Sequence, residues 1–139
     1  MTPYEPDNIF AKIIAGAIPS HKVYEDEETL AFMDVMPQSN GHCLVIPKTG
    51  SRNLLDAEPM TLGNLIAVTQ RVAQAAKRAF NADGIMIQQF NEAPAGQTVF
   101  HLHFHVVPRY EGVGLSAHSG KMADQEVLAA NAAKLRAAL

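Results

Sequence analysis

The chain has 139 residues, 47% of them hydrophobic, and a formal net charge of -3 from 11 basic and 14 acidic residues. This length and composition predict one domain spanning residues 1–139, with a hydrophobic core of its own. The charge balance, without a basic run, excludes nucleic-acid binding through charge alone, and no apolar stretch is long enough to cross a membrane. The single cysteine, Cys43, and a start unlike a secretory signal predict a cytoplasmic protein without disulfides.

The first half of the chain predicts one short helix and three short strands. Apolar residues at helical spacing indicate the helix, which Gly16 and Pro19 end. Runs rich in β-branched and aromatic residues, separated by an acidic turn, predict a hairpin, and a compact apolar run stopped by Pro47 predicts a buried strand. The expected elements are a helix over 8–15 and strands over 22–25, 29–35 and 43–46.

The second half predicts one long helix, two strands and a final helix. Asp56 is a candidate helix cap, and an apolar stripe from Leu62 to Phe80 indicates the longest helix. Three glycines without periodic pattern predict a mobile loop over 111–120. The remaining expected elements are strands over 85–90 and 99–107 and an alanine-rich helix from about Ala123. Together these elements predict an α+β fold with an antiparallel sheet of about five strands.

Three histidines occupy alternate positions of the predicted strand 99–107, at His101, His103 and His105. Side chains of a strand switch faces at every residue. The three imidazoles should therefore share one face of the strand, and the apolar residues between them should take the other.

Three interpretations of this histidine strand remain open. It is a solvated face, or a metal-binding pair, or a nucleophile with supporting imidazoles. All three cannot bind one zinc ion on a straight strand, because His101 and His105 would lie about 13 Å apart. Just upstream, Gly96, Gln97 and Thr98 offer close backbone approach, an amide and a hydroxyl, which favours a phosphate as the electrophile.

The pattern His-x-His-x-His followed by two apolar residues, here 101–107, resembles the signature of the histidine triad (HIT) family of nucleotidyl hydrolases and transferases. Further matching segments follow in the same order over nearly the whole chain, at 9–14, 18–19, 30–38, 41–48, Asn91 and 96–99. Residues 108–112 resemble the bacterial Hint-type branch. The resemblance implies a HIT-like fold with one long helix, a short N-terminal helix and a C-terminal helix.

The resemblance also implies a catalytic role for each matching position. His103 would attack the α-phosphate of a purine nucleotide substrate and form a nucleotidyl-histidine intermediate, which water then hydrolyses. His105 would contact the phosphate, and His101 would orient the nucleophile. The other implied catalytic positions are His42, which approaches the triad, and Gln97 and Thr98, which hold the phosphate and the leaving group.

The nucleotide pocket implied by the resemblance uses polar and apolar residues. Asp34 and Asn91 would contact the ribose and phosphate, and Ile9, Phe10, Ile13, Ile18, Phe32 and Val35 would line the base. Without the resemblance, Asp34 would bond its own turn, His42 would be a core or turn histidine, and the apolar residues would be plain core. His21 and His118 match no family position and are expected at the surface.

The expected activity is cleavage of nucleoside phosphoramidates or nucleotidyl amines, with no cofactor and no metal. The alternatives are a dinucleoside polyphosphate hydrolase and a nucleotide-binding sensor or scaffold with little turnover. Some bacterial members bind structural zinc through Cys-x-x-Cys near the first helix, but Asn8 and Ala11 occupy those positions here and predict no zinc. The resemblance further implies a homodimer through the long helix and the region of the strand 85–90.

Overall fold

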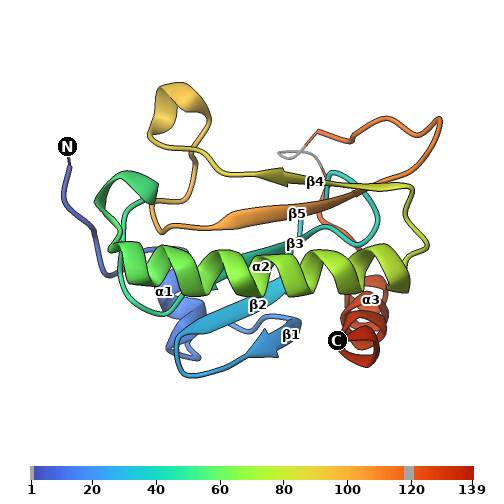
Figure 1. The fold of residues 1–139 in the computed structure, drawn as a ribbon, viewed down its shortest axis with the longest axis horizontal. Helices are drawn as coiled ribbons and strands as arrows, with labels where there is room; N and C mark the ends of the chain where they lie inside the picture. The colour runs from blue at the N-terminus through green and yellow to red at the C-terminus, as the bar shows by residue number, and fades with distance from the viewer. Residues whose placement is uncertain (1, 118–120) are drawn as a thin grey trace.

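The computed structural model describes residues 2–117 and 121–139, which form a five-stranded antiparallel sheet and three α-helices (Figure 1). The strand order across the sheet is β1-β2-β3-β5-β4. The predicted α+β class and antiparallel sheet are therefore confirmed. The strands are β1 (Lys22–Glu25), β2 (Thr29–Met33), β3 (Cys43–Pro47), β4 (Gly84–Gln88) and β5 (Phe104–Arg109), and the helices are α1 (Ile9–Ile14), α2 (Pro59–Ala79) and α3 (Gln125–Ala138).

The hairpin of β1 and β2 forms because one aspartate closes its turn. Asp26 Oδ1 accepts hydrogen bonds from the amides of Glu28 and Thr29, both at 2.8 Å. Such local side-chain bonds favour turns over continued strands. The hairpin was predicted correctly, although β2 ends at Met33, two residues before the predicted end.

The two faces of the sheet are covered by different helices. α2 runs across one face in Figure 1, with α3 at the β1 end of that face, and α1 packs on the other. Side chains of a strand alternate between the two faces, and because helices cover both faces, β2 and β3 are buried along their whole length. The core under α2 and α3 includes Ala31, Met33, Cys43, Val45, Leu102 and Val106, and the core under α1 consists of Phe10, Ile13, Leu30, Phe32, Leu44 and Ile46.

The start of α2 differs from the prediction. Asp56 was expected to cap this helix, but it belongs to the preceding 3₁₀ helix η1 (Leu54–Asp56). There its carboxylate accepts from the amides of Arg52 and Asn53, both at 3.0 Å, which completes a capping box with Asn53. The long helix instead begins at Pro59, whose missing amide proton costs nothing at the first helical position.

The shorter helices begin at polar caps. Asn8 Oδ1 accepts from the amide of Ala11 at 2.9 Å and starts α1, and Asp124 accepts from Glu126 at 3.1 Å and starts α3 two residues after the predicted start. Residues 111–117 form neither helix nor strand, as predicted. The rest of that predicted loop, with His118, lies outside the described residues. Within the described ranges, no helix combines the length and the hydropathy that a bilayer crossing requires.

Candidate active site

The chain enters the histidine segment through a bend. Residues 99–101 bend and β5 begins only at Phe104, so the predicted strand over 99–107 is wrong in its first half. Backbone groups that a sheet would use are engaged elsewhere. The Leu102 amide donates to the Ser51 carbonyl at 2.8 Å, and the carbonyl of residue 101 accepts a side-chain bond at 2.7 Å.

The expected alternation of faces is present despite the bend. Leu102 and Val106 are buried in the core under α2 and α3. On the other face, the ring centroids of His103 and His105 lie 5.0 Å apart. β5 pairs His105 with Leu44, and opposed residues of an antiparallel pair point to the same side. The histidines therefore share the face that α1 covers.

His103 has its tautomer set by the main chain. Its Nδ1 lies 2.7 Å from the carbonyl oxygen of His101, which has no proton to donate, so Nδ1 carries the proton. A neutral ring then has a lone pair on Nε2, the atom a nucleophile needs. The ring of Phe10 meets the His103 ring edge-on at 5.0 Å between centroids, which restricts its rotation.

His101 is held on both of its ring nitrogens. Nε2 donates to the Pro47 carbonyl at 2.7 Å, so Nδ1 of the neutral ring is an acceptor, and it lies 2.7 Å from the Tyr4 hydroxyl. Burial lowers the pKa of His101 to about 4, with a smaller contribution in the same direction from His103. His101 is therefore neutral near pH 7, and its ring has no nitrogen left to offer a substrate.

His42 and His105 form a second fixed pair. The amide of Gln38 donates to His42 Nδ1 at 3.0 Å, so neutral His42 carries its proton on Nε2. That Nε2 lies 3.0 Å from Nδ1 of His105 and donates to it. The proton of neutral His105 is then on its own Nε2, where it can donate to an anionic oxygen. This chain of bonds brings His42 to the triad.

Asp34 lies beside this pair and is almost fully buried. Its Oδ1 accepts from the amide of Met36 at 2.9 Å, the local turn bond expected of such an aspartate. Its Oδ2 lies 3.4 Å from His42 Nε2. The carboxylate therefore supports the same protonation of His42 that the Gln38 amide sets.

A metal ion does not fit the donors of this group. Asp34, His42 and His105 have candidate ligand atoms within 4.8 Å of one another. A metal would need the lone pair of His42 Nε2, yet the Gln38 amide occupies the lone pair of Nδ1 and leaves the proton on Nε2. Asn8, one of the two positions considered above for a cysteine pair, instead caps α1.

The apolar residues predicted to surround a base do not all behave alike. Phe10, Ile13 and Phe32 are buried together in the core under α1, and Ile18 is half-buried against them. Ile9 and Val35 are instead exposed, at 48% and 39%. The first four therefore form one apolar cluster, which contacts His103 through Phe10, whereas the other two lie outside that cluster.

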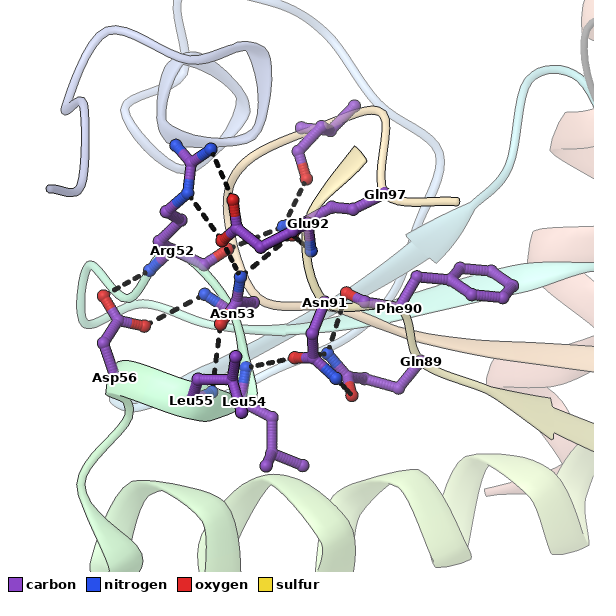
Figure 2. Close-up of polar contacts among 11 residues, drawn as sticks. Arg52, Asn53, Leu54, Leu55, Asp56, Gln89, Phe90, Asn91, Glu92 and Gln97 are labelled. Carbon is purple, nitrogen blue, oxygen red and sulfur yellow. Dashed lines mark hydrogen bonds and ion pairs between the residues drawn. The ribbon is translucent and has the colours of Figure 1, made fainter. Parts of the chain in front are cut away.

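Gln97 and Asn91 belong to contacts that join the loop after β4 to the loop after β3 (Figure 2). In Figure 2 the Glu92 carboxylate lies between Arg52, which it binds at 2.9 and 3.0 Å, and Asn53, at 2.6 Å. Asn53 also donates to Gln97 at 3.0 Å. We call Arg52, Asn53, Glu92 and Gln97 the loop brace. Glu92 has φ of 75°, which residues other than glycine rarely adopt, so these bonds also hold a strained backbone.

The amide of Gln97 has no capacity left for a ligand. Its oxygen accepts from Asn53 and from the Glu92 amide, and its nitrogen donates to the carbonyls of Arg52 and Val99. These four bonds use every donor and acceptor of a glutamine side chain. In this structure Gln97 holds a loop, and its predicted contact with phosphate stays a prediction.

Asn91 and Thr98 are also more peripheral than the histidines. Asn91 exchanges hydrogen bonds with Gln89 and accepts one from the Leu54 amide, so its predicted contact with ribose or phosphate also remains a prediction. Thr98 is exposed and, with Ile9 and Arg52, lines a surface pocket of about 400 Å³. Its hydroxyl is therefore accessible to a bound molecule.

Sequence reasoning missed Tyr4 and three members of the loop brace. The bracing residues come from segments about forty residues apart, so no local pattern links them. A weak signal was present in the pair Asn53 and Asp56, whose spacing of three is that of a capping box. Tyr4 lies 97 residues from His101 in sequence, and nothing in the sequence joins them.

Comparison with known proteins places these residues in a family. The model of the HIT domain matches residues 15–112, which include all three triad histidines and His42. A crystal structure of a Hit-like protein from Bartonella henselae, involved in cell-cycle regulation, is 55% identical with a TM-score of 0.96, over 99% of this chain and 100% of that one. A zinc-bound histidine triad family protein from Mycobacterium smegmatis is 41% identical with a TM-score of 0.84, over 95% and 92% of the two chains.

A relative with a named activity is more distant. The adenylylsulfatase HINT3 of Arabidopsis thaliana is 36% identical over 105 residues, which are 76% of this chain and 53% of that protein. The matched family model and the near-complete structural similarity agree with one another. The chain belongs to the HIT domain family.

Proposed function

We propose that the protein is a purine nucleotide hydrolase of the bacterial Hint-like branch that cleaves nucleoside 5′-phosphoramidates or nucleotidyl amines at the α-phosphate. The observation that carries this proposal is the bond from His103 Nδ1 to the His101 carbonyl, which leaves the lone pair on Nε2. His105, with its ring beside that of His103, has a proton on Nε2 for a phosphate oxygen. The reaction needs no metal or other cofactor.

The reaction has two displacements at phosphorus. In the first, Nε2 of His103 forms a bond to the α-phosphorus while the bond to the leaving amine breaks, and the amine takes a proton from the Thr98 hydroxyl or a water. In the second, water attacks phosphorus and the bond to Nε2 breaks. A proton from the attacking water returns to the group that protonated the amine. His105 donates a hydrogen bond to the phosphate oxygen throughout. Splitting one hard step into two is the usual benefit of a covalent nucleophile.

The nucleoside would lie against the apolar cluster that contacts His103 through Phe10. Phe10, Ile13, Ile18 and Phe32 would supply the apolar surface that a purine base needs. We assign the ribose hydroxyls to Asp34, since an ionised carboxylate accepts several hydrogen bonds at once. Ile9 and Val35 would form the outer edge of this pocket.

The named relative supports a reaction at an adenylyl group. HINT3 is called an adenylylsulfatase, and its similarity to this chain extends over about three quarters of this chain. An adenylyl substrate has a nucleoside α-phosphate, the group that the histidines here would receive. The leaving group is a separate property, which the experiment must settle.

The test compares three substrate types in one assay. Adenosine 5′-phosphoramidate, adenylyl sulfate and diadenosine polyphosphates differ in the leaving group but share the adenylyl group. We expect the highest kcat/KM for the phosphoramidate. A preference for the diadenosine compounds would favour the alternative hydrolase, and tight AMP binding without turnover of any substrate would favour a sensor and contradict the proposal.

We also propose that two copies pair through α2 and the exposed edge of β4. Ile66 and Ile87 are exposed at 49% and 42% and line an apolar depression of about 570 Å³ between these elements. Among the described strands, β4 pairs with β5 alone, so its other edge is available to a second copy. Analytical ultracentrifugation should find a dimer that Ile87→Lys weakens, and a monomeric wild type would contradict this assembly. Cytoplasm remains the expected location.

A further inference from the structure

Tyr4 reaches the histidine triad from the segment that precedes α1. Its hydroxyl lies 2.7 Å from Nδ1 of His101, and the two rings meet edge-on with centroids 5.5 Å apart. The segment is attached to α1 through Asn8, which donates to the Glu5 carbonyl at 2.8 Å and caps the helix. Tyr4 is therefore linked through this segment to the start of α1.

The direction of the Tyr4 hydrogen bond follows from the other nitrogen of the ring. Nε2 of His101 donates to the Pro47 carbonyl, which can only accept. Nδ1 of the neutral ring is then a lone pair, and the phenol must be the donor. Loss of the phenol would leave a buried acceptor without its partner, since the His101 side chain is fully shielded from water.

Gly50 provides the space in which the Tyr4 ring lies. A Cβ at position 50 would come within 2.5 Å of Cε2 and 3.0 Å of Cζ of Tyr4. The backbone of Gly50 is not in the left-handed region, so conformation does not require a glycine here. A glycine is instead needed because the ring of Tyr4 leaves no room for a Cβ.

We propose that Tyr4, seated on Gly50, is a positioning residue for His103 and acts through His101; this role rests on the proposed function. Tyr4 and Pro47 hold the two edges of the His101 ring, and the ring orients the main chain of residue 101. The carbonyl of that residue is the acceptor for Nδ1 of His103. The Tyr4 hydroxyl thus helps to orient the nucleophilic Nε2 of His103 without contacting the substrate.

Tyr4→Phe removes the hydroxyl and keeps the ring, and Tyr110→Phe is its matched control. The control variant also loses one hydrogen bond, the one from the Tyr110 hydroxyl to the Asn40 carbonyl at 2.7 Å, but Tyr110 does not bond a triad histidine. We expect Tyr4→Phe to lower kcat about tenfold, the effect of one lost hydrogen bond, with KM within about twofold of wild type. Tyr110→Phe should leave both constants unchanged.

Imidazole NMR gives a readout that a general loss of stability would not move. In wild type, Nδ1 of His101 should have the ¹⁵N shift of a hydrogen-bonded lone pair. In Tyr4→Phe it should move toward the value of an unbonded lone pair, and the Nδ1 proton of His103 should exchange faster with water. An unchanged His101 signal in Tyr4→Phe would overturn the proposal.

A double-mutant cycle tests the role of Gly50 separately. Gly50→Ala should displace the Tyr4 ring and lower kcat, whereas in a Tyr4→Ala background the same change should cost nothing further. If Gly50→Ala lowered kcat by the same factor in both backgrounds, the seating of Tyr4 on Gly50 would be contradicted. Gly63→Ala is the control, because a Cβ there meets no atom within 4 Å.

The two proposals fail in different ways. If wild type cleaves none of the substrates while the NMR signals of His101 and His103 respond to Tyr4→Phe, the proposed function fails and the positioning of the rings stands. If wild type is active but neither the NMR signals nor kcat change in Tyr4→Phe, the role of Tyr4 fails and the proposed function stands.

Discussion

His103 donates its Nδ1 proton to the main-chain carbonyl of His101, at 2.7 Å. The two residues are neighbours of the same motif, yet the bond joins a ring to a backbone and not one ring to another. It requires the chain to bend before β5, and it leaves His103 Nε2 as the unprotonated atom. The proposed chemistry depends on this bond more than on any other contact.

Replacement of His103 by alanine should abolish hydrolysis. Removing a covalent nucleophile typically lowers turnover by about 10³-fold or more, because the remaining groups cannot supply the covalent path. AMP binding, measured by calorimetry, should stay close to wild type. His21→Ala is the control, since the half-exposed His21 ring bonds the Gln125 side chain on α3. A His103→Ala protein with near wild-type turnover would disprove the assignment.

The pH dependence of kcat/KM should show an acid limb. The nucleophile must be unprotonated, and histidine in model peptides titrates near about 6.5, so activity should fall at pH values near or below this. His42, His101, His103 and His105 share one site, so the limb should reflect a coupled set of imidazoles. The measurement is kcat/KM from about pH 4 to 8. A flat profile would show that no imidazole controls the reaction.

The stability of the fold should also depend on His101. Its pKa is about 4 in the folded chain, lowered by burial, against about 6.5 when unfolded. The unfolded chain therefore binds the proton more tightly, so the stabilisation is complete above about pH 6.5 and is lost as pH falls through about 4. The difference of the two pKa values corresponds to about 3 kcal/mol.

Urea denaturation of wild type and His101→Gln at pH 7.5 and pH 4 measures this loss. The free energy of unfolding should fall by about 3 kcal/mol more in wild type than in the variant, because only wild type carries the titrating ring. Equal losses in both proteins would mean that His101 does not titrate as its burial requires.

Chelators should leave the activity unchanged. The Gln38 amide holds Nδ1 of His42 as an acceptor, which keeps the proton on the nitrogen that a metal would need. The measurement combines metal analysis of purified protein with activity before and after dialysis against EDTA. Stoichiometric zinc whose removal abolishes activity and whose return restores it would contradict this prediction.

The sequence predicted the sheet and its helices well where local chemistry decides the structure. β1 matches its predicted bounds, and α1 lies within its predicted range because Asn8 and the residues after Ile14 set its ends. The prediction failed where two sets of nearby amides compete for one side chain. Asp56 has the chemistry of a helix cap, but the amides of Arg52 and Asn53 are closer partners than the first turn of α2.

The candidate site shows the same division. Alternation correctly predicted that the three histidines share a face, because period two depends only on an extended backbone. It could not predict the bend before Phe104, where side-chain bonds replace sheet bonds. Nor could it predict that every donor and acceptor of the Gln97 side chain is used within the protein, since those partners are set by tertiary structure.

The most direct test of the central claim is to locate the covalent intermediate. Protein mixed with an excess of adenosine 5′-phosphoramidate would be quenched within the first turnover at alkaline pH, where phosphorus–nitrogen bonds to histidine survive, then digested and mapped by mass spectrometry. We predict an adenylyl group on the peptide that contains His103, located on that residue by fragmentation. An adenylyl group on another residue, or a burst of released AMP without any labelled peptide, would contradict the account.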